Sequence, residues 1–157
     1  MSTSSYTNQL TLSENKLVAR ALRCLEKQLC YNSEILNSSK SVKAFLQLQL
    51  ANEPNEVFAV LFLDNQHRLL AFEKIFYGTI NESAVYPRVV VQKALLHNAA
   101  KVIFAHNHPS GFAKPSDSDK KMNNELQFIL SIISVIAVDH IIVSSKETFS
   151  FKEHNLM

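Results

Sequence analysis

The fold is decided by the stretch VFAVLFLDNQHRLLAFEKIFY, residues 57–77. Residues 57–63 are all apolar, a pattern typical of a strand that is buried on both faces of a sheet. The polar residues 64–67 predict a hairpin turn, and residues 68–77 predict the returning strand, which ends at Gly78. We therefore expect a central hairpin with the rest of the sheet built around it.

Helices and strands also alternate on both sides of this hairpin. Apolar residues at helical spacing, or short apolar runs, predict helices over 13–30, 41–51, 87–98 and 118–136, and strands over 101–106, 138–144 and 148–151. The triplet Val89–Val91 favours a strand and competes with the helix that Pro87 would begin. Together these elements predict an α/β fold, a mixed β-sheet flanked by helices.

The length of 157 residues predicts one main domain with a real core. We expect residues 1–39 to form an N-terminal tail and an amphipathic helix, and residues 40–157 to form the domain. The apolar face of that first helix would hold Leu17, Val18, Ala21, Leu22, Leu25 and Leu29. Cys24 and Cys30 have no metal-binding spacing and are interpreted as ordinary thiols.

Composition and charge exclude some classes of protein. The first ten residues, MSTSSYTNQL, lack the basic and apolar regions of a secretory signal. No apolar run approaches the roughly 20 residues that cross a bilayer, so we expect a cytoplasmic protein with no membrane partner. The net charge is +2 without a basic run, so charge gives no support for direct nucleic-acid binding.

A candidate metal site follows the predicted strand 101–106. In extended backbone, residues i and i+2 point to the same face, so His106 and His108 can present two imidazoles to one ion. Asp119, in the first turn of the next helix, can supply a third ligand. Three protein ligands leave a fourth position open on zinc, where a hydrolase holds its water. Alone, either histidine is more typical of a core or surface residue and the aspartate of a helix cap, but together they favour a metal site.

A zinc hydrolase also needs a base, and four carboxylates lie near predicted strand ends: Glu53, Glu56, Glu73 and Glu82. Glu56 precedes the strand 57–63 and would face the metal pocket if that strand pairs with 101–106. Glu73, inside the returning strand, is its rival. Ser116 can donate to an oxyanion or cap the next helix, and both interpretations stay open. Ser110 and Gly111 lie in the turn; glycine is rare here, so Gly78 and Gly111 indicate special backbone geometry.

Residues 106–119, HNHPSGFAKPSDSD, resemble the JAMM metal signature, which is His-x-His, seven residues, Ser, two residues and Asp. The sequence of this segment is similar to that of the RadC-like branch of the JAB/MPN superfamily. Similar segments occur in the same order at 56–73, 76–80, 84–88, 98–111 and 139–143, and the resemblance covers about 40–157. One departure is Val89, which stands where the family usually has glutamate after Pro-Arg. The letters HNH do not make a nuclease, because that name refers to dispersed residues.

The resemblance implies a JAB/MPN-like fold in which His106, His108 and Asp119 bind Zn²⁺, Glu56 is the acid/base and Ser116 stabilises the oxyanion. It implies a hydrolase of peptide or isopeptide bonds. The alternative is a metal-containing binding module, without turnover, whose partner is a DNA-repair or mobile-element protein. Full-length RadC proteins carry an N-terminal helix-hairpin-helix region for which the residues before 40 are too few, so the chain resembles a short stand-alone form.

Overall fold

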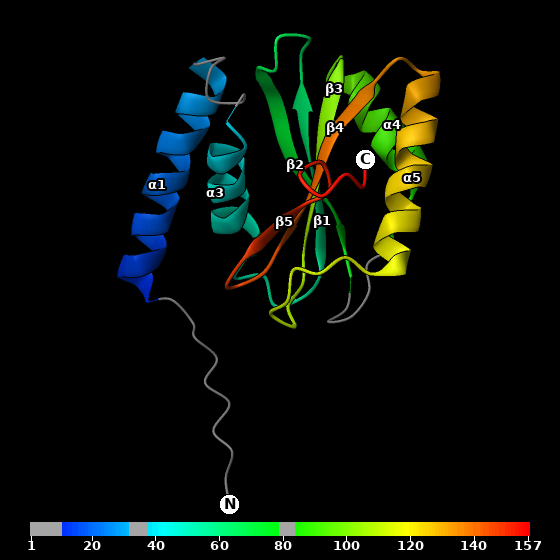
Figure 1. Ribbon diagram of the computed structural model, residues 1–157. Coiled ribbons are helices and arrows are strands. Elements are labelled where there is room, and N and C mark those ends of the chain that lie inside the picture. The colour runs from blue at the N-terminus through cyan, green and yellow to red at the C-terminus, as the bar shows by residue number, and fades with distance from the viewer. Residues whose placement is uncertain (1–10, 32–37, 79–83) are drawn as a thin grey trace, which may run out of the picture.

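The computed structural model describes residues 11–31, 38–78 and 84–157, with only the backbone described for 26–31. Its helices are α1 (Leu12–Tyr31), α3 (Ser39–Leu50), α4 (Pro87–Leu96) and α5 (Asp117–Ile132), and its strands are β1 (Val57–Leu63), β2 (Leu69–Tyr77), β3 (Lys101–Asn107), β4 (Ile136–Val143) and β5 (Thr148–Ser150). The predicted mixed sheet flanked by helices is confirmed (Figure 1). None of the helices in the described part of the chain is long and apolar enough to cross a bilayer.

The sheet has five strands in the order β2-β1-β3-β4-β5. β1 pairs with β2 through the predicted hairpin, and it pairs antiparallel with β3 on its other side. β3 and β4 are parallel, and the short β5 returns antiparallel to β4. Because β1 and β3 run in opposite directions, the start of β1 meets the carboxyl end of β3. Residues that precede β1 and residues that follow β3 therefore lie at one edge of the sheet.

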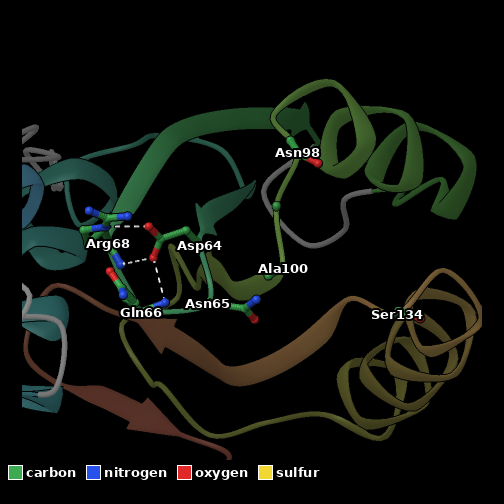
Figure 2. A pocket seen from close by; sticks show the side chains of 8 residues that line it. Asp64, Asn65, Gln66, Arg68, Asn98, Ala100 and Ser134 are labelled. Atoms are coloured by element: carbon green, nitrogen blue, oxygen red, sulfur yellow. Dashed lines mark hydrogen bonds and ion pairs between the residues drawn. The ribbon is translucent and has the colours of Figure 1, made fainter.

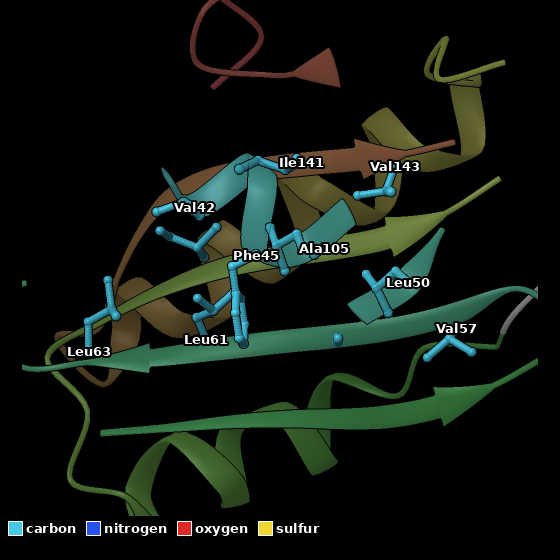
Figure 3. Packing of buried hydrophobic residues seen from close by; sticks show 12 residues of the cluster. Val42, Phe45, Leu50, Val57, Leu61, Leu63, Ala105, Ile141 and Val143 are labelled. Atoms are coloured by element: carbon cyan, nitrogen blue, oxygen red, sulfur yellow. The ribbon is translucent and has the colours of Figure 1, made fainter. Parts of the chain in front are cut away.

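Both faces of the sheet are covered, which explains why every residue of β1 is buried. On one face, α3 packs Val42, Phe45, Leu46 and Leu50 against residues such as Leu61 and Ala105 (Figure 3). On the other face, α4 and α5 pack Val90, Ala94, Leu126 and Leu130 against Val60 and Phe104. A sheet with helices on both sides selects continuous apolar strands rather than alternating ones.

Two predicted helices end earlier than expected. The helix predicted over 118–136 ends at Ile132, and β4 begins at Ile136, inside the predicted helix. Ser134 turns the chain with a left-handed φ of 59°, and Asn98 does the same after α4 with φ of 50°. Neither turn contains the glycine that usually marks the end of a helix. The sequence therefore gives no clear sign that the helix ends there, and the predicted helices extend too far.

The amphipathic first helix is present, but its apolar face is only partly used. Leu22 and Leu25 pack against the α3 side of the core, whereas Leu17, predicted on the same apolar face, is 68% exposed. Cys24 is exposed and free, as an ordinary thiol would be. The side chains of Leu29 and Cys30 lie outside the described part of the chain.

Candidate metal centre

The end of β3 and the start of α5 bring three candidate ligands together. His106 is buried within β3, His108 follows the strand, and Asp119 is buried in the first turn of α5. Their ligand atoms all lie within 4.8 Å of one another. The two Nε2 atoms of the histidines are 3.0 Å apart, and Asp119 oxygens lie 3.3 Å from Nε2 of His106 and 3.5 Å from Nε2 of His108. The three residues can therefore hold one ion.

Local geometry fixes where Asp119 lies. Ser116 is the N-cap of α5: its Oγ accepts the backbone N–H of Asp119 at 3.1 Å, and an Asp119 carboxylate oxygen accepts the backbone N–H of Ser116 at 2.7 Å. This reciprocal capping box anchors the start of the helix. Gly111 has φ of +93° in the preceding loop, which confirms that it marks a special backbone position. Ser110 is exposed in the same turn.

The hydrogen bonds of His108 set which of its nitrogens faces the cluster. Its Nδ1 lies 2.9 Å from the backbone oxygen of Phe112, which can only accept, so Nδ1 carries the hydrogen. Nε2 then has a lone pair directed toward His106 and Asp119. A second ring nitrogen and a carboxylate at this distance repel that lone pair unless a hydrogen or a metal ion lies between them. Imidazole and carboxylate together are ligands that zinc accepts.

The electrostatics of the cluster favour a negative Asp119. Burial works against the charged carboxylate, but the neighbouring His106 and His108 and the backbone N–H of Ser116 outweigh it, so the pKa of Asp119 is held well below its ordinary value. Burial also opposes the charged form of His108, yet Asp119, the Phe112 carbonyl and the charge of Glu56 together raise the pKa of His108. The cluster therefore attracts positive charge.

The structure places Glu56 beside this cluster. β1 pairs with β3, which is the condition on which Glu56 was expected to face the metal pocket. Phe58 lies opposite His106, and continuing that register brings Glu56 opposite His108. Glu56 is half-buried, and its charge is close enough to raise the pKa of His108. Its backbone oxygen accepts the N–H of Gly78 at 2.8 Å. Glu56 therefore stays the candidate base.

The other candidate carboxylates have different surroundings. Glu73 forms ion pairs with Lys93 and His97 of α4. Glu53 pairs with Lys74. Glu82 lies outside the described residues. Neither Glu53 nor Glu73 belongs to the group of potential ligands at His106.

The sequence analysis missed Asn107, which lies between the two histidines. Its side chain is on the opposite face of the strand, where Oδ1 accepts the backbone N–H of Val57 at 2.7 Å and Nδ2 donates to the backbone oxygen of Asn55 at 3.0 Å. Asn107 thus ties the segment that carries Glu56 to the end of β3. Neighbouring residues of a strand point to opposite faces, so Asn107 faces away from the histidines, but spacing along the chain does not show what it meets there.

His140 was also missed, although it lies in the quoted segment 139–143. It is fully buried in β4, and its Nε2 lies 2.8 Å from Nδ1 of His106. The distance in sequence between β3 and β4 gave no signal of this contact.

A separate cavity of about 510 Å³ lies at the opposite edge of the sheet (Figure 2). It is lined by Asp64, Asn65, Gln66, Arg68, Asn98, Ala99, Ala100 and Ser134. The Asp64 carboxylate accepts hydrogen bonds from Gln66 and Arg68, and the backbone N–H groups of Ala100 and Ser134 donate to other backbone oxygens. These polar groups are thus engaged with the protein itself, which makes this cavity a weaker candidate than the histidine cluster.

Comparison with known proteins gives matches over most of the chain. A family model described as RadC-like JAB domain matches residues 36–156. The UPF0758 protein Mpe_A2695 of Methylibium petroleiphilum is 50% identical over 87% of this chain and 61% of its own length. The UPF0758 protein RSc2444 of Ralstonia nicotianae is 46% identical over 90% of this chain and 62% of its own. The UPF0758 protein YkfG of Escherichia coli is 42% identical over 95% of this chain and 94% of its own. The chain thus spans about three fifths of the first two relatives and nearly all of the third.

Proposed function

The chain belongs to the RadC-like JAB domain family, and from this premise we propose that it is a zinc-dependent hydrolase of amide bonds in peptides or isopeptides. One observation carries the proposal. The ligand atoms of His106, His108 and Asp119 lie within 4.8 Å of one another, and the charge of Glu56 reaches the same cluster. Metal-assisted hydrolysis needs ligands that hold the metal ion and a separate carboxylate that acts as the base.

The three ligands would hold the zinc through the two Nε2 atoms and a carboxylate oxygen. Zinc bound in this way supplies Lewis acidity and lowers the pKa of water to about 7. The charge of Asp119 is retained at neutral pH, because its pKa lies well below the ordinary value despite its burial. Asp119 is therefore already deprotonated, and it can bind a metal without first losing a proton.

Glu56 would move the proton. Its carboxylate takes a proton from the attacking water and then delivers it to the nitrogen of the leaving amine. The position of Glu56 depends on Asn107, which binds the backbone on both sides of it, at Asn55 and Val57. This clamp supports the role, because a general base must be held within reach of its proton.

Ser116 would stabilise the oxyanion. Its Oγ already accepts the N–H of Asp119, so its lone pair is used by the helix while its own hydrogen can be donated. The helix-cap interpretation and the oxyanion interpretation are therefore compatible in one hydroxyl. A donor that helps to hold a developing negative charge is worth about 10²–10³ in rate in other hydrolases.

The test is turnover with a matched control. Zinc-loaded protein is screened against a library of peptides and isopeptide conjugates, beside Glu56→Gln purified in the same way. We expect cleavage by the wild type that stops with a chelator, returns with zinc and is absent from Glu56→Gln. If both proteins are inactive across the library while both capture the same DNA-repair or mobile-element protein, the chain is a metal-containing binding module instead.

A further inference from the structure

His140 is a polar residue in an apolar environment that the proposed reaction does not use. Its ring is fully buried in β4 and contacts the rings of Phe58, Phe104 and Phe151. A buried imidazole is costly unless both of its nitrogens find hydrogen-bond partners. His140 has two: Asn123 of α5 at 3.2 Å from Nδ1, and His106 at 2.8 Å from Nε2.

The direction of these bonds follows from Asn123. Its Nδ2 donates to the sulfur of Met157 at 3.5 Å, and its Oδ1 faces His140. An amide oxygen can only accept, so Nδ1 of His140 carries the hydrogen. The ring is fully buried among aromatic side chains, and Nε2 lies 2.8 Å from Nδ1 of His106. With the ring hydrogen on Nδ1, Nε2 presents a lone pair to that neighbour. That lone pair accepts a hydrogen from Nδ1 of His106.

We propose that His140 and Asn123 are positioning residues that form a hydrogen-bond relay, which keeps the hydrogen of His106 on Nδ1 and so presents the Nε2 lone pair of His106 to the metal. The relay rests on the metal site of the proposed function but not on hydrolysis. It gives a role to His140, which contacts the metal cluster through His106 but is not a candidate ligand. Partners of this kind fix the tautomer and the ring orientation of metal-binding histidines.

The relay also links two ligands through one helix. Asn123 follows Asp119 by one turn of α5, so both side chains lie on the same side of the helix. The helix α5 therefore supplies the ligand Asp119 and, one turn later, Asn123, whose Oδ1 is the hydrogen-bond acceptor at the start of the relay. His108 obtains its tautomer differently, from the Phe112 carbonyl of its own loop. A shift of α5 would thus disturb Asp119 and His106 together and leave the tautomer of His108 unchanged.

The first test needs no variant. Long-range ¹H–¹⁵N spectra of zinc-free wild-type protein, at a pH well above the ordinary histidine pKa, report which ring nitrogen carries the hydrogen. We expect Nδ1–H for both His106 and His140. A hydrogen on Nε2 of His106 in the zinc-free protein would overturn the relay, whether or not the protein hydrolyses anything.

The second test measures zinc affinity by competition with a chromophoric chelator. His140→Leu removes the acceptor, and we expect its affinity to fall by about 10- to 100-fold, the range for loss of such a partner. His140→Gln keeps an acceptor and should recover part of that loss. Phe151→Leu is the matched control, because the Phe151 ring stacks on His140 at 4.6 Å without a side-chain hydrogen bond. The backbone N–H of Phe151 donates to the His140 carbonyl, and this bond does not depend on the side chain.

The outcomes are distinct. Equal losses in His140→Leu and Phe151→Leu would mean that His140 only packs, and the relay would be rejected. If His140→Leu does not fold, the wild-type spectrum and the zinc affinity of His140→Gln decide whether the relay is accepted. A wild type that binds zinc and shows Nδ1–H on His106 but cleaves no substrate supports the relay and contradicts only the hydrolase. A wild type that binds no zinc contradicts both proposals.

Discussion

Among the described residues, two clusters bring histidine nitrogens to a carboxylate, and they differ in the source of positive charge. At the β2–α4 contact, Glu73 meets His97 and also Lys93, whose Nζ lies 2.6 Å from the carboxylate. At the end of β3, Asp119 meets His106 and His108, and in the described part of the chain no lysine or arginine forms an ion pair with it. The first cluster contains its own cation, whereas the second needs one.

The difference shows why residue type alone does not identify a metal site. Both clusters combine the same kinds of side chain, and both lie on the face of the sheet that α4 and α5 cover. What separates them is that Lys93 neutralises Glu73, while no described lysine or arginine does the same for Asp119. The comparison predicts that metal affects one cluster only.

The largest effect expected is the loss of the metal itself. Removing a ligand in His106→Ala or Asp119→Ala should take the zinc content from one per chain to almost none, because the two ligands that remain hold the ion poorly. His97→Ala and Glu73→Gln should keep it. Metal analysis of the purified variants measures this. Unchanged zinc in both ligand variants would remove the distinction between the clusters.

The next effect separates the carboxylates by role. Glu56→Gln removes a base but no ligand, so we expect it to keep zinc and to lose about 10²- to 10⁴-fold in hydrolysis rate. Glu73→Gln should keep most of the activity, because its carboxylate is paired with Lys93 and His97. Kinetics with any substrate found for the wild type test this prediction. If Glu73→Gln is the inactive variant, the base has been placed wrongly.

The sequence predicted the parts of the site that lie in local motifs. The sequence identified His106, His108, Ser116 and Asp119 because the strand, the turn and the start of the helix that carry them follow one another directly along the chain. The pairing of β1 with β3, which brings Glu56 to His108, was only a condition in the sequence analysis, because two apolar runs do not show which strands are neighbours.

The rest depended on contacts between distant segments. The bond from His106 to His140 requires the parallel register of β3 and β4, and the bond to Asn123 requires the docking of α5. Neither can be derived from spacing along the chain. The helix ends were missed for a different reason, because Asn98 and Ser134 adopt left-handed φ at positions where glycine is the usual signal.

A smaller effect is expected on stability when the metal is removed. A ligand that binds only the folded state stabilises it by about 2.7 kcal/mol at 100 times its Kd. For a domain of this size that corresponds to roughly 5–11 °C in Tm. Thermal unfolding with zinc and with a chelator should show this difference in the wild type but not in Asp119→Ala. An equal response in both would mean that zinc stabilises the fold from another site.

The smallest effect belongs to the cluster that contains its own cation. The hydrogen bond from Lys93 is the largest contribution to the pKa of Glu73; burial opposes it, and His97 adds to it, so the net pKa is below the ordinary value of 4.5. A carboxylate whose pKa is lowered on folding stabilises the fold above its unfolded pKa, and this stability is lost as the pH falls through the folded value.

At neutral pH, Glu73→Gln should therefore lower the free energy of unfolding by up to about 1 kcal/mol, as expected for a partly exposed ion pair. The gap between the two proteins should close as the pH falls below 4.5. Thermal unfolding against pH measures the gap, and Glu125→Gln, which changes an exposed glutamate of α5, is the matched control. Because Lys93 is present with or without zinc, a chelator should leave the gap unchanged. A gap that appears only in zinc-loaded protein would show that the two clusters are coupled, and the contrast between them would then fail.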